Sequence, residues 1–396
     1  MGLALIGVVL AVLGMRHKQS IRIPTNLIGV ETVAVLVSLV GLISVVFNST
    51  PDYAYVTYVV SMTVWLSAAY TICVLIKYVH KKITVELLTI YLTAVCVCQC
   101  IFALAIDSNV AVKNFVDSYV MQDQLLMMEL KRLYGIGASL DTAGVRFSAC
   151  LIMLTVVLNM NKSKMNKATI ALSITAYLWI AVVGNMVART TIIGVGLSLL
   201  YALVAFKPQS VSLSFFRTIR IGIAILFITL LVCIYLYDNS EQFHQLSRFA
   251  FEGFFNWAET GEWVIDSNEK LKTMIVFPDN VKTWIIGDGY FVNPYDIDAT
   301  YVGSKTGGYY MGTDIGYCRF IFYFGLVGLF TFAFFFSFVA RECILLQPNF
   351  KLLILFILLL GFVIWFKVAT DVFLVFALLL CVGNMQDKTL IYEEGK

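Results

Sequence analysis

Eleven long apolar runs limit what this chain can fold into more than any other feature of its sequence. A helix needs roughly 17–25 residues to cross the hydrocarbon core of a bilayer, and the shorter runs reach this length with one further turn. The runs lack the strict apolar–polar alternation of a transmembrane strand, so they predict helices. They cover residues 2–14, 27–47, 54–76, 85–106, 142–160, 168–184, 190–206, 219–237, 317–340, 352–366 and 371–384.

The composition is that of a chain dissolved in lipid. Its residues are 60% hydrophobic and 13% charged, whereas a soluble domain is about half apolar and a quarter charged. Within hydrocarbon the chain must satisfy its own backbone polar groups, which a helix does. We therefore predict an all-α polytopic membrane protein with about eleven transmembrane helices. A net charge of +3 without a basic cluster indicates no nucleic-acid partner.

The positively charged residues predict the orientation in the membrane. Lysine and arginine fall on every second connection, and the alternate short connections hold almost none. Because cytoplasmic connections are enriched in these residues, we expect the N-terminus outside and the C-terminus in the cytoplasm. The basic connections lie at residues 16–22, 77–82, 162–167, 207–220, 341–351 and 388–396.

Two outward connections are long, at residues 107–141 and 238–316. The second is longer than an unstructured loop should be, so it should fold. Residues 244–257 predict one helix with an apolar side, and residues 266–275 predict another. The chain then divides into a bundle of eight helices at 1–237, an outer loop at 238–316 and three final helices at 317–396.

Four arginines are predicted on the outward side, where the charge bias disfavours them: Arg146, Arg189, Arg248 and Arg319. The planar guanidinium donates two parallel hydrogen bonds that suit phosphate or carboxylate oxygens. Snorkelling to headgroups explains Arg146 and Arg319 equally well, and solvation on an amphipathic helix explains Arg248. Arg189 interrupts otherwise almost uncharged short connections, which favours a functional role.

Acidic and aromatic residues crowd the outer loop, which carries twelve carboxylates against five basic residues. Asp314 stands out because it directly precedes a span and lies five residues before Arg319, where it could act as a general base or form a salt bridge. Trp284 and Tyr290 could stack on sugars, although such residues also populate membrane interfaces. A single outward histidine, His244, makes no metal site, and we predict no metal or other cofactor.

Taken in order, four stretches resemble the O-antigen polymerase and O-antigen ligase superfamily of bacterial polysaccharide assembly. They are VARTTIIG at 187–194, Ser247-Arg248, WIIGDGYF at 284–291, and DIGYCRFIFYFGLVG at 314–328. The resemblance covers roughly the second half of the chain. Ligases of this group carry a histidine in the last stretch, where this chain has Asp314, so the resemblance favours a polymerase.

The resemblance implies a GT-C-type glycosyltransferase of the inner membrane that joins undecaprenyl-diphosphate-linked oligosaccharides at the periplasmic face in lipopolysaccharide or capsule synthesis. Asp314, Arg189 and Arg248 would be catalytic; Arg146, Arg319, Tyr317, Trp284 and Tyr290 would bind the diphosphate or the glycan. Membrane lipids and a chain-length regulator protein are the further partners. The alternatives are an O-antigen ligase and a flippase or transporter of the same lipid-linked sugar. A transporter should show mid-span charges, short loops and repeat symmetry.

Overall fold

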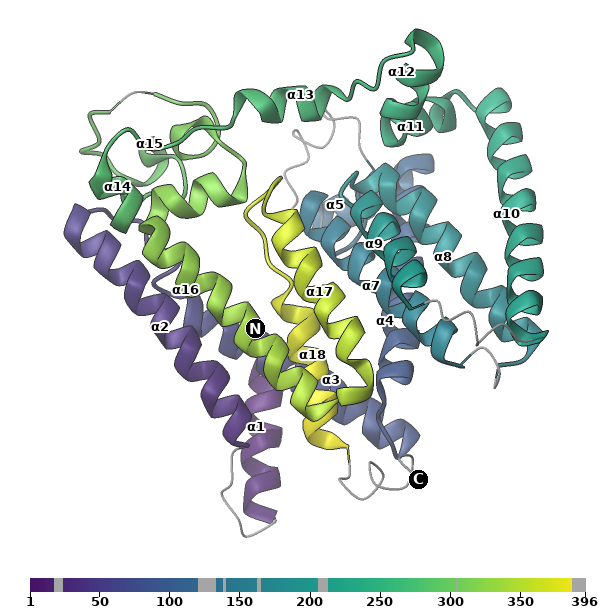
Figure 1. Cartoon of the computed structure of the whole chain (residues 1–396), viewed down its shortest axis with the longest axis horizontal. Coiled ribbons are helices and arrows are strands. Elements are labelled where there is room, and N and C mark those ends of the chain that lie inside the picture. The colour runs from purple at the N-terminus through teal and green to yellow at the C-terminus, as the bar shows by residue number, and fades with distance from the viewer. Residues whose placement is uncertain are drawn as a thin grey trace. The chain divides into compact units, whose positions relative to one another are not determined.

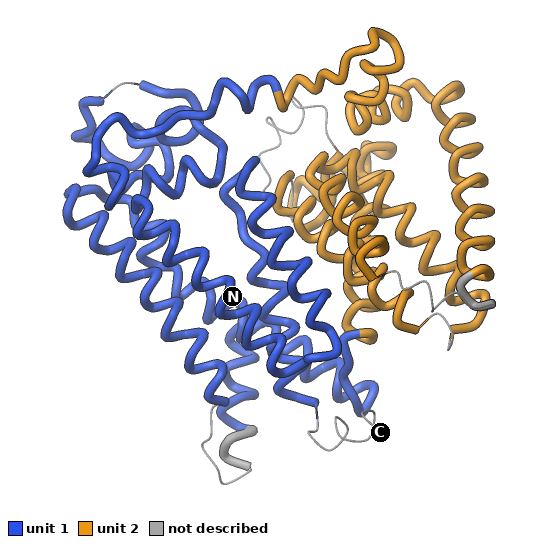
Figure 2. Tube along the Cα trace, in the orientation of Figure 1, with its two compact units in different colours: residues 1–85, 269–396 blue, residues 86–268 orange. Residues whose placement is uncertain are grey.

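The computed structural model describes residues 1–17, 24–119, 133–137, 140–161, 165–205, 213–303 and 305–386. Within these ranges the regular elements are α-helices and short 3-10 helices, and no described residue belongs to a strand (Figure 1). The chain forms two compact units (Figure 2). Unit 1 comprises residues 1–85 and 269–396, and unit 2 comprises residues 86–268.

Each of the eleven predicted apolar runs overlaps a helix. Seven of these helices are long and apolar enough to cross a membrane, which confirms an all-α polytopic membrane protein as the class. The other four have 13 to 16 residues, and a full count of eleven spans stays a prediction. The seven are α2 (Thr25–Asn48), α3 (Tyr58–His80), α4 (Val85–Ser108), α7 (Leu140–Asn161), α8 (Lys167–Val187), α10 (Leu213–Asn239) and α16 (Gly316–Leu346); the four are α1 (Gly2–His17), α9 (Thr191–Val204), α17 (Lys351–Ile364) and α18 (Phe373–Met385).

The long connection at residues 238–316 is folded, and its first part differs from the prediction. The single helix predicted over 244–257 is wrong, because the chain leaves helical geometry at Phe251 and two helices form. The break lets Gly253 pack against the ring of Trp263, where a Cβ atom would lie 2.8 Å from the indole. The shorter elements are α5 (Val110–Tyr119), α11 (Glu241–Ala250), α12 (Glu252–Thr260), α13 (Asp266–Thr273), α14 (Val281–Ile286), α15 (Pro294–Ile297), η2 (Tyr310–Gly312) and η3 (Pro348–Phe350).

Aromatic side chains form the core of unit 1, where α16 packs between α2, α17 and α18. Phe320 and Phe332 of α16 have ring centroids 5.1 Å apart, and both contact Trp365 at 5.0 and 5.2 Å. Tyr55, from the connection between α2 and α3, packs edge-on against the same two phenylalanines. Such pairs each add about 0.5–1.5 kcal/mol beyond the burial of their area.

A kink in α16 holds the loop against the bundle of unit 1. Gly325 has φ +68, so the helix is interrupted there. The carbonyl oxygens of Phe322 and Tyr323 instead accept hydrogen bonds from Asp288 N and Gly289 N at 2.6 and 3.1 Å. A Cβ atom on Gly325 would lie 2.1 Å from the carbonyl oxygen of α14 that faces it. The loop therefore docks closely only because this position is a glycine.

In unit 2, α7 is the central helix, with α8 and α9 packed on it. Two glycines bring α7 and α9 together, because a Cβ on Gly144 would lie 2.0 Å from Thr190 Oγ1 and one on Gly194 would lie 2.2 Å from the Ser148 backbone. Ser148 Oγ donates to Thr190 O at 3.1 Å and accepts from Gly194 N at 3.2 Å. This close approach places the connection that carries Arg189 against the end of α7.

Candidate functional site

The predicted site residues divide between the two units. Unit 1 holds Asp314, Tyr317, Arg319, Trp284 and Tyr290, and unit 2 holds Arg146, Arg189 and Arg248.

Arg319 is the most buried of the four arginines, with 4% of its surface exposed in the first turn of α16. Its guanidinium lies between two rings, 3.7 Å from the centroid of Phe291 and 3.4 Å from that of Tyr309. Nη2 donates to Phe291 O at 3.0 Å, while the buried Nε has no hydrogen-bond partner among the described residues. A desolvated cation stacked on aromatic faces gains about 2 kcal/mol, so the rings offset part of the cost of burying this charge.

Asp314 lies just before α16 and is the acidic side chain whose charge acts on Arg319. It is half-buried, and no ion pair joins it to any residue that the structure describes. The neighbouring backbone is held in place, because Ile315 N donates to the fully buried Thr313 hydroxyl at 3.2 Å. The backbone next to Asp314 is therefore held by a hydrogen bond, while the Asp314 carboxylate forms no ion pair with a described residue.

Tyr309 covers Arg319 from a segment of unusual backbone conformation. Gly308, Met311 and Gly312 all have positive φ, at +71, +57 and +65. Met311 has the largest conformational cost of the three, because residues with a side chain disfavour positive φ. Tyr309 itself is 39% exposed, so one face of its ring meets the guanidinium while the remainder is open. Tyr309 therefore covers one face of the Arg319 guanidinium.

Asp52 is a residue next to the candidate site that sequence reasoning missed. Only 4% of it is exposed, in the connection between α2 and α3. Its Oδ2 accepts from Phe291 N and Val292 N at 2.7 and 3.0 Å, and its Oδ1 accepts from Ala54 N at 3.0 Å. Asp52 thereby anchors the loop segment that carries Phe291, whose ring contacts the Arg319 guanidinium. A lone carboxylate in a short connection between two spans is the signal that could have indicated it, because a buried charge must be hydrogen-bonded.

Tyr290 belongs to a hydrogen-bonded group of loop residues. Its hydroxyl donates to Asp298, and its ring packs against Tyr301 and Tyr310. Burial, followed by the hydrogen bond to Asp298, raises the pKa of Tyr290 well above its ordinary value. The nearby Asp288 accepts from the Tyr310 hydroxyl at 3.2 Å. These phenol and carboxylate oxygens hydrogen-bond within the loop, and the role of Tyr290 in glycan binding stays a prediction.

Trp284 and Tyr317 have structural partners. Trp284 Nε1 donates to Pro278 O at 2.8 Å, and its ring stacks on Phe277. Tyr317 faces α17, since its hydroxyl donates to Phe362 O at 3.0 Å. Packing accounts for both side chains, and their predicted roles in glycan binding stay predictions.

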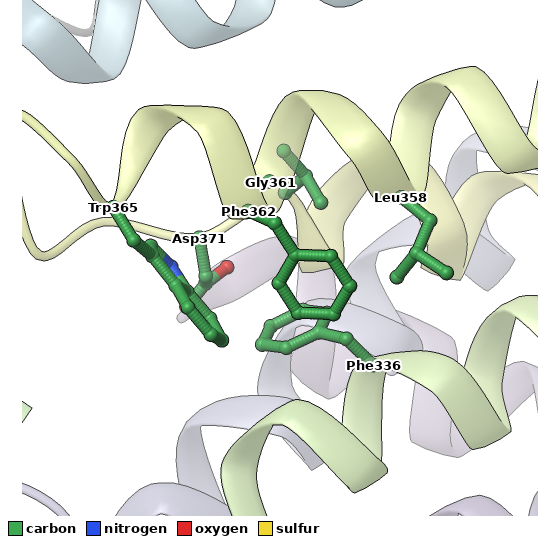
Figure 3. A pocket seen from close by; sticks show the side chains of 7 residues that line it. Phe336, Leu358, Gly361, Phe362, Trp365 and Asp371 are labelled. Carbon is green, nitrogen blue, oxygen red and sulfur yellow. The ribbon is translucent and has the colours of Figure 1, made fainter. Parts of the chain in front are cut away.

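A crevice beside α17 offers no room for a ligand. It is lined by side chains that include Phe336, Phe362, Trp365 and Asp371, and it holds no space for a water molecule (Figure 3). Asp371 Oδ1 accepts from Phe373 N at 2.9 Å, which caps the start of α18. The crevice is therefore a seam in the packing of unit 1.

Arg189 holds the loop helices of unit 2 to the connection between α8 and α9. Nε donates to Phe249 O at 2.9 Å, Nη1 donates to Ser267 Oγ at 3.0 Å, and Nη2 lies 2.7 Å from Glu252 Oε2. The guanidinium carbon also lies 4.0 Å from the centroid of the Phe249 ring. All three nitrogens are thus engaged by the protein, and both charged side chains are largely buried. Arg189 therefore links the loop helices to the connection between α8 and α9 through its three guanidinium nitrogens.

Arg248 is partly exposed and pairs with the carboxylate of Glu259. Its two terminal nitrogens donate to Glu259 at 2.6 and 2.7 Å, and both side chains are well exposed. The hydrogen bond from Arg248 lowers the pKa of Glu259, and the same bond raises the pKa of Arg248. Water competes with an exposed pair of this kind, so an incoming anion can displace Glu259.

Arg146 is half-buried in α7, close enough to Cys96 of α4 for its charge to act on that thiol. Asp141, at the start of the same helix, accepts from the Thr190 hydroxyl at 3.1 Å.

Comparison with protein-family models, with curated proteins and with solved structures finds no match to this chain.

Proposed function

We propose that this chain is a GT-C-type membrane glycosyltransferase, an O-antigen or capsule-type polymerase. It would join undecaprenyl-diphosphate-linked repeat units at the periplasmic face of the bacterial inner membrane, with its N-terminus periplasmic. The observation that carries the proposal is the Asp314 carboxylate, which forms no ion pair with any described residue and lies five residues before the buried Arg319 at the start of a membrane helix. An uncommitted carboxylate in a fixed position is what a general base requires.

The reaction needs one proton acceptor and one site for developing negative charge. Asp314 takes the proton from the hydroxyl group of the acceptor sugar. The oxygen of that hydroxyl group attacks the anomeric carbon of the donor. The bond between that carbon and the diphosphate oxygen breaks, and the electron pair stays on the diphosphate. A positioned base contributes about 10²- to 10⁴-fold to the rate, and cationic groups near the diphosphate stabilise the departing charge.

The arginines support this chemistry to different degrees. Arg319 can meet the diphosphate only after Tyr309 moves from its guanidinium. Arg248 can exchange Glu259 for a phosphate at little cost because the pair is exposed. Arg189 would have to give up three protein contacts, so a structural contribution accounts for it better than a catalytic one.

The test of the base is Asp314→Asn in cells that depend on this chain for polymer. Polymer amount should fall at least about 100-fold, since the amide cannot accept the proton. Asp296→Asn is the matched control, because it removes an exposed loop carboxylate. Unchanged polymer length and amount in Asp314→Asn would remove this assignment.

Lysine substitutions separate binding from folding at the two loop arginines. A lysine keeps the charge and loses the two-pronged donor. Arg248→Lys should lower polymer formation and leave the melting temperature in detergent unchanged. Arg189→Lys should lower the melting temperature together with activity. Full activity in Arg248→Lys would show that this guanidinium is not used.

Reconstitution separates the polymerase from its alternatives. The purified chain in vesicles with undecaprenyl-diphosphate-linked repeat units should yield longer glycans. Transfer of the glycan to a lipid or protein acceptor would indicate a ligase, and movement across the bilayer without elongation would indicate a flippase.

A further inference from the structure

A long groove runs along the surface of unit 1, away from Asp314 and Arg319. It has a volume of about 1160 Å³, and its walls come from α1, α2, α3 and the end of α18. Ligand pockets usually hold about 300–1,000 Å³, so this groove is large enough for a whole lipid. Its lining along α3 and the C-cap of that helix extends from Thr63 to Lys81, which are 18 positions apart, or about 27 Å at 1.5 Å per residue.

The walls of the groove are apolar. Val8 and Val12 of α1, Ile28 and Val35 of α2, and Leu66 of α3 are among the side chains that line it. Most of these remain exposed in unit 1, and α2 and α3 are long and apolar enough to span a membrane. Hydrocarbon is the environment that such a surface fits.

Two lysines mark one end of the groove. Lys77 Nζ donates to Met385 O at 2.7 Å, which leaves two of its three N–H groups for a ligand. Lys81 lies at the C-terminal end of α3, where its ammonium is 5.0 Å from the centroid of the Tyr78 ring. Lys77, Lys81 and Tyr78 all line the groove. This end therefore offers a phosphate two cations and a hydroxyl.

A carboxyl group lies toward the opposite end. Glu31 lines the groove and accepts from the Thr63 hydroxyl at 3.1 Å. Thr63 and Lys77 are 14 residues apart on α3, which corresponds to about 21 Å along its axis. An anionic headgroup beside Glu31 would be repelled, so the charges permit one orientation of an anionic amphiphile.

We propose that this groove binds an anionic phospholipid, with its phosphate on Lys77 and Lys81 and its acyl chains along α1, α2 and α3. An acyl chain spans half of the hydrocarbon core, about 15 Å. From the lysines it ends before the level of Glu31, so its tail does not have to desolvate that carboxyl group. The proposal is independent of the glycosyltransferase proposal, because none of the groove residues takes part in that chemistry.

The test measures lipid retention by the full-length chain in detergent, using native mass spectrometry. Phosphatidylglycerol should be retained in preference to phosphatidylcholine with the same acyl chains. Each lysine near a lipid surface contributes about fivefold in affinity, so Lys77→Gln with Lys81→Gln should weaken phosphatidylglycerol binding about 30-fold. Lys82→Gln is the matched control, since Lys82 carries the same charge next to Lys81 and does not line the groove.

Two further arms separate this site from general adhesion of lipid. Ala11→Phe puts a ring into the groove and should lower retention of phosphatidylglycerol without changing the melting temperature. Inorganic phosphate at millimolar concentration should not displace the lipid, because it lacks the acyl chains. Equal retention of the two lipids, or an equal effect of the double variant and the Lys82 control, would overturn the proposal.

Discussion

Asp52 connects the loop to the helix bundle of unit 1. The substitution Asp52→Asn tests how much this residue contributes to the attachment of the loop. Three backbone N–H groups, those of Ala54, Phe291 and Val292, converge on its two oxygens. An asparagine has one oxygen and one NH₂ group, so it can keep the bonds to Phe291 and Val292 only by turning NH₂ toward Ala54 N. Two donors then face each other in a buried position.

The size of the effect follows from these three bonds. Losing a hydrogen bond to a charged group costs about 1.5–3 kcal/mol. The two bonds that remain become neutral and weaken by roughly 0.5–1 kcal/mol each. Together these losses should weaken the attachment of the loop by about 2.5–5 kcal/mol, and each 1.4 kcal/mol is tenfold in an equilibrium.

The rate of hydrogen–deuterium exchange at the amides of Phe291 and Val292 measures how often the loop detaches from Asp52. Exchange should accelerate by roughly two to three and a half orders of magnitude in Asp52→Asn, because the local opening becomes more frequent. Asp279→Asn is the control, since Asp279 is an exposed loop carboxylate. Equal exchange in the Asp52 variant and the parent chain, or an equal change in the control, would refute the role given to Asp52.

Two further predictions concern the arginines. The pKa of Glu259 is lowered from its ordinary value of 4.5 by Arg248, so the pair stabilises unit 2 fully above pH 4.5 and loses this contribution as the pH falls through the lowered pKa. Melting curves between pH 6 and pH 3 should show this acid-dependent loss, and Glu259→Gln should remove it. Tyr309→Ala should uncover Arg319, so modification of Arg319 by phenylglyoxal, followed by mass spectrometry, should become at least several times faster; an unchanged rate would mean that Tyr309 is not the cover.

Several features of the site could be predicted without the structure. Asp314 and Arg319 lie five residues apart at the start of a span, and local sequence is enough to place them at one helix end. The glycines of the GDG stretch at 287–289 predict a turn, and Gly287 and Gly289 do have positive φ. Both predictions depend on neighbours in the chain, which is why the sequence contains them.

The contacts made over long sequence separations could not be predicted. Asp52 meets Phe291 across 239 residues, and the docking of the GDG turn onto the kink in α16 depends on both partners at once. The commitment of Arg189 to Glu252 and Ser267, and the break at Phe251, likewise follow from packing that no local pattern encodes.

The sequence alone determined that this chain is a helical membrane protein, because apolar runs of bilayer length leave the backbone no other way to satisfy its hydrogen bonds. Tertiary structure decided which charges are already neutralised inside the protein, and it left Asp314 without an ion pair to any described residue. The reason is that burial and pairing are properties of surroundings, and the residues that surround Arg319, Asp52 and Arg189 come from distant parts of the chain.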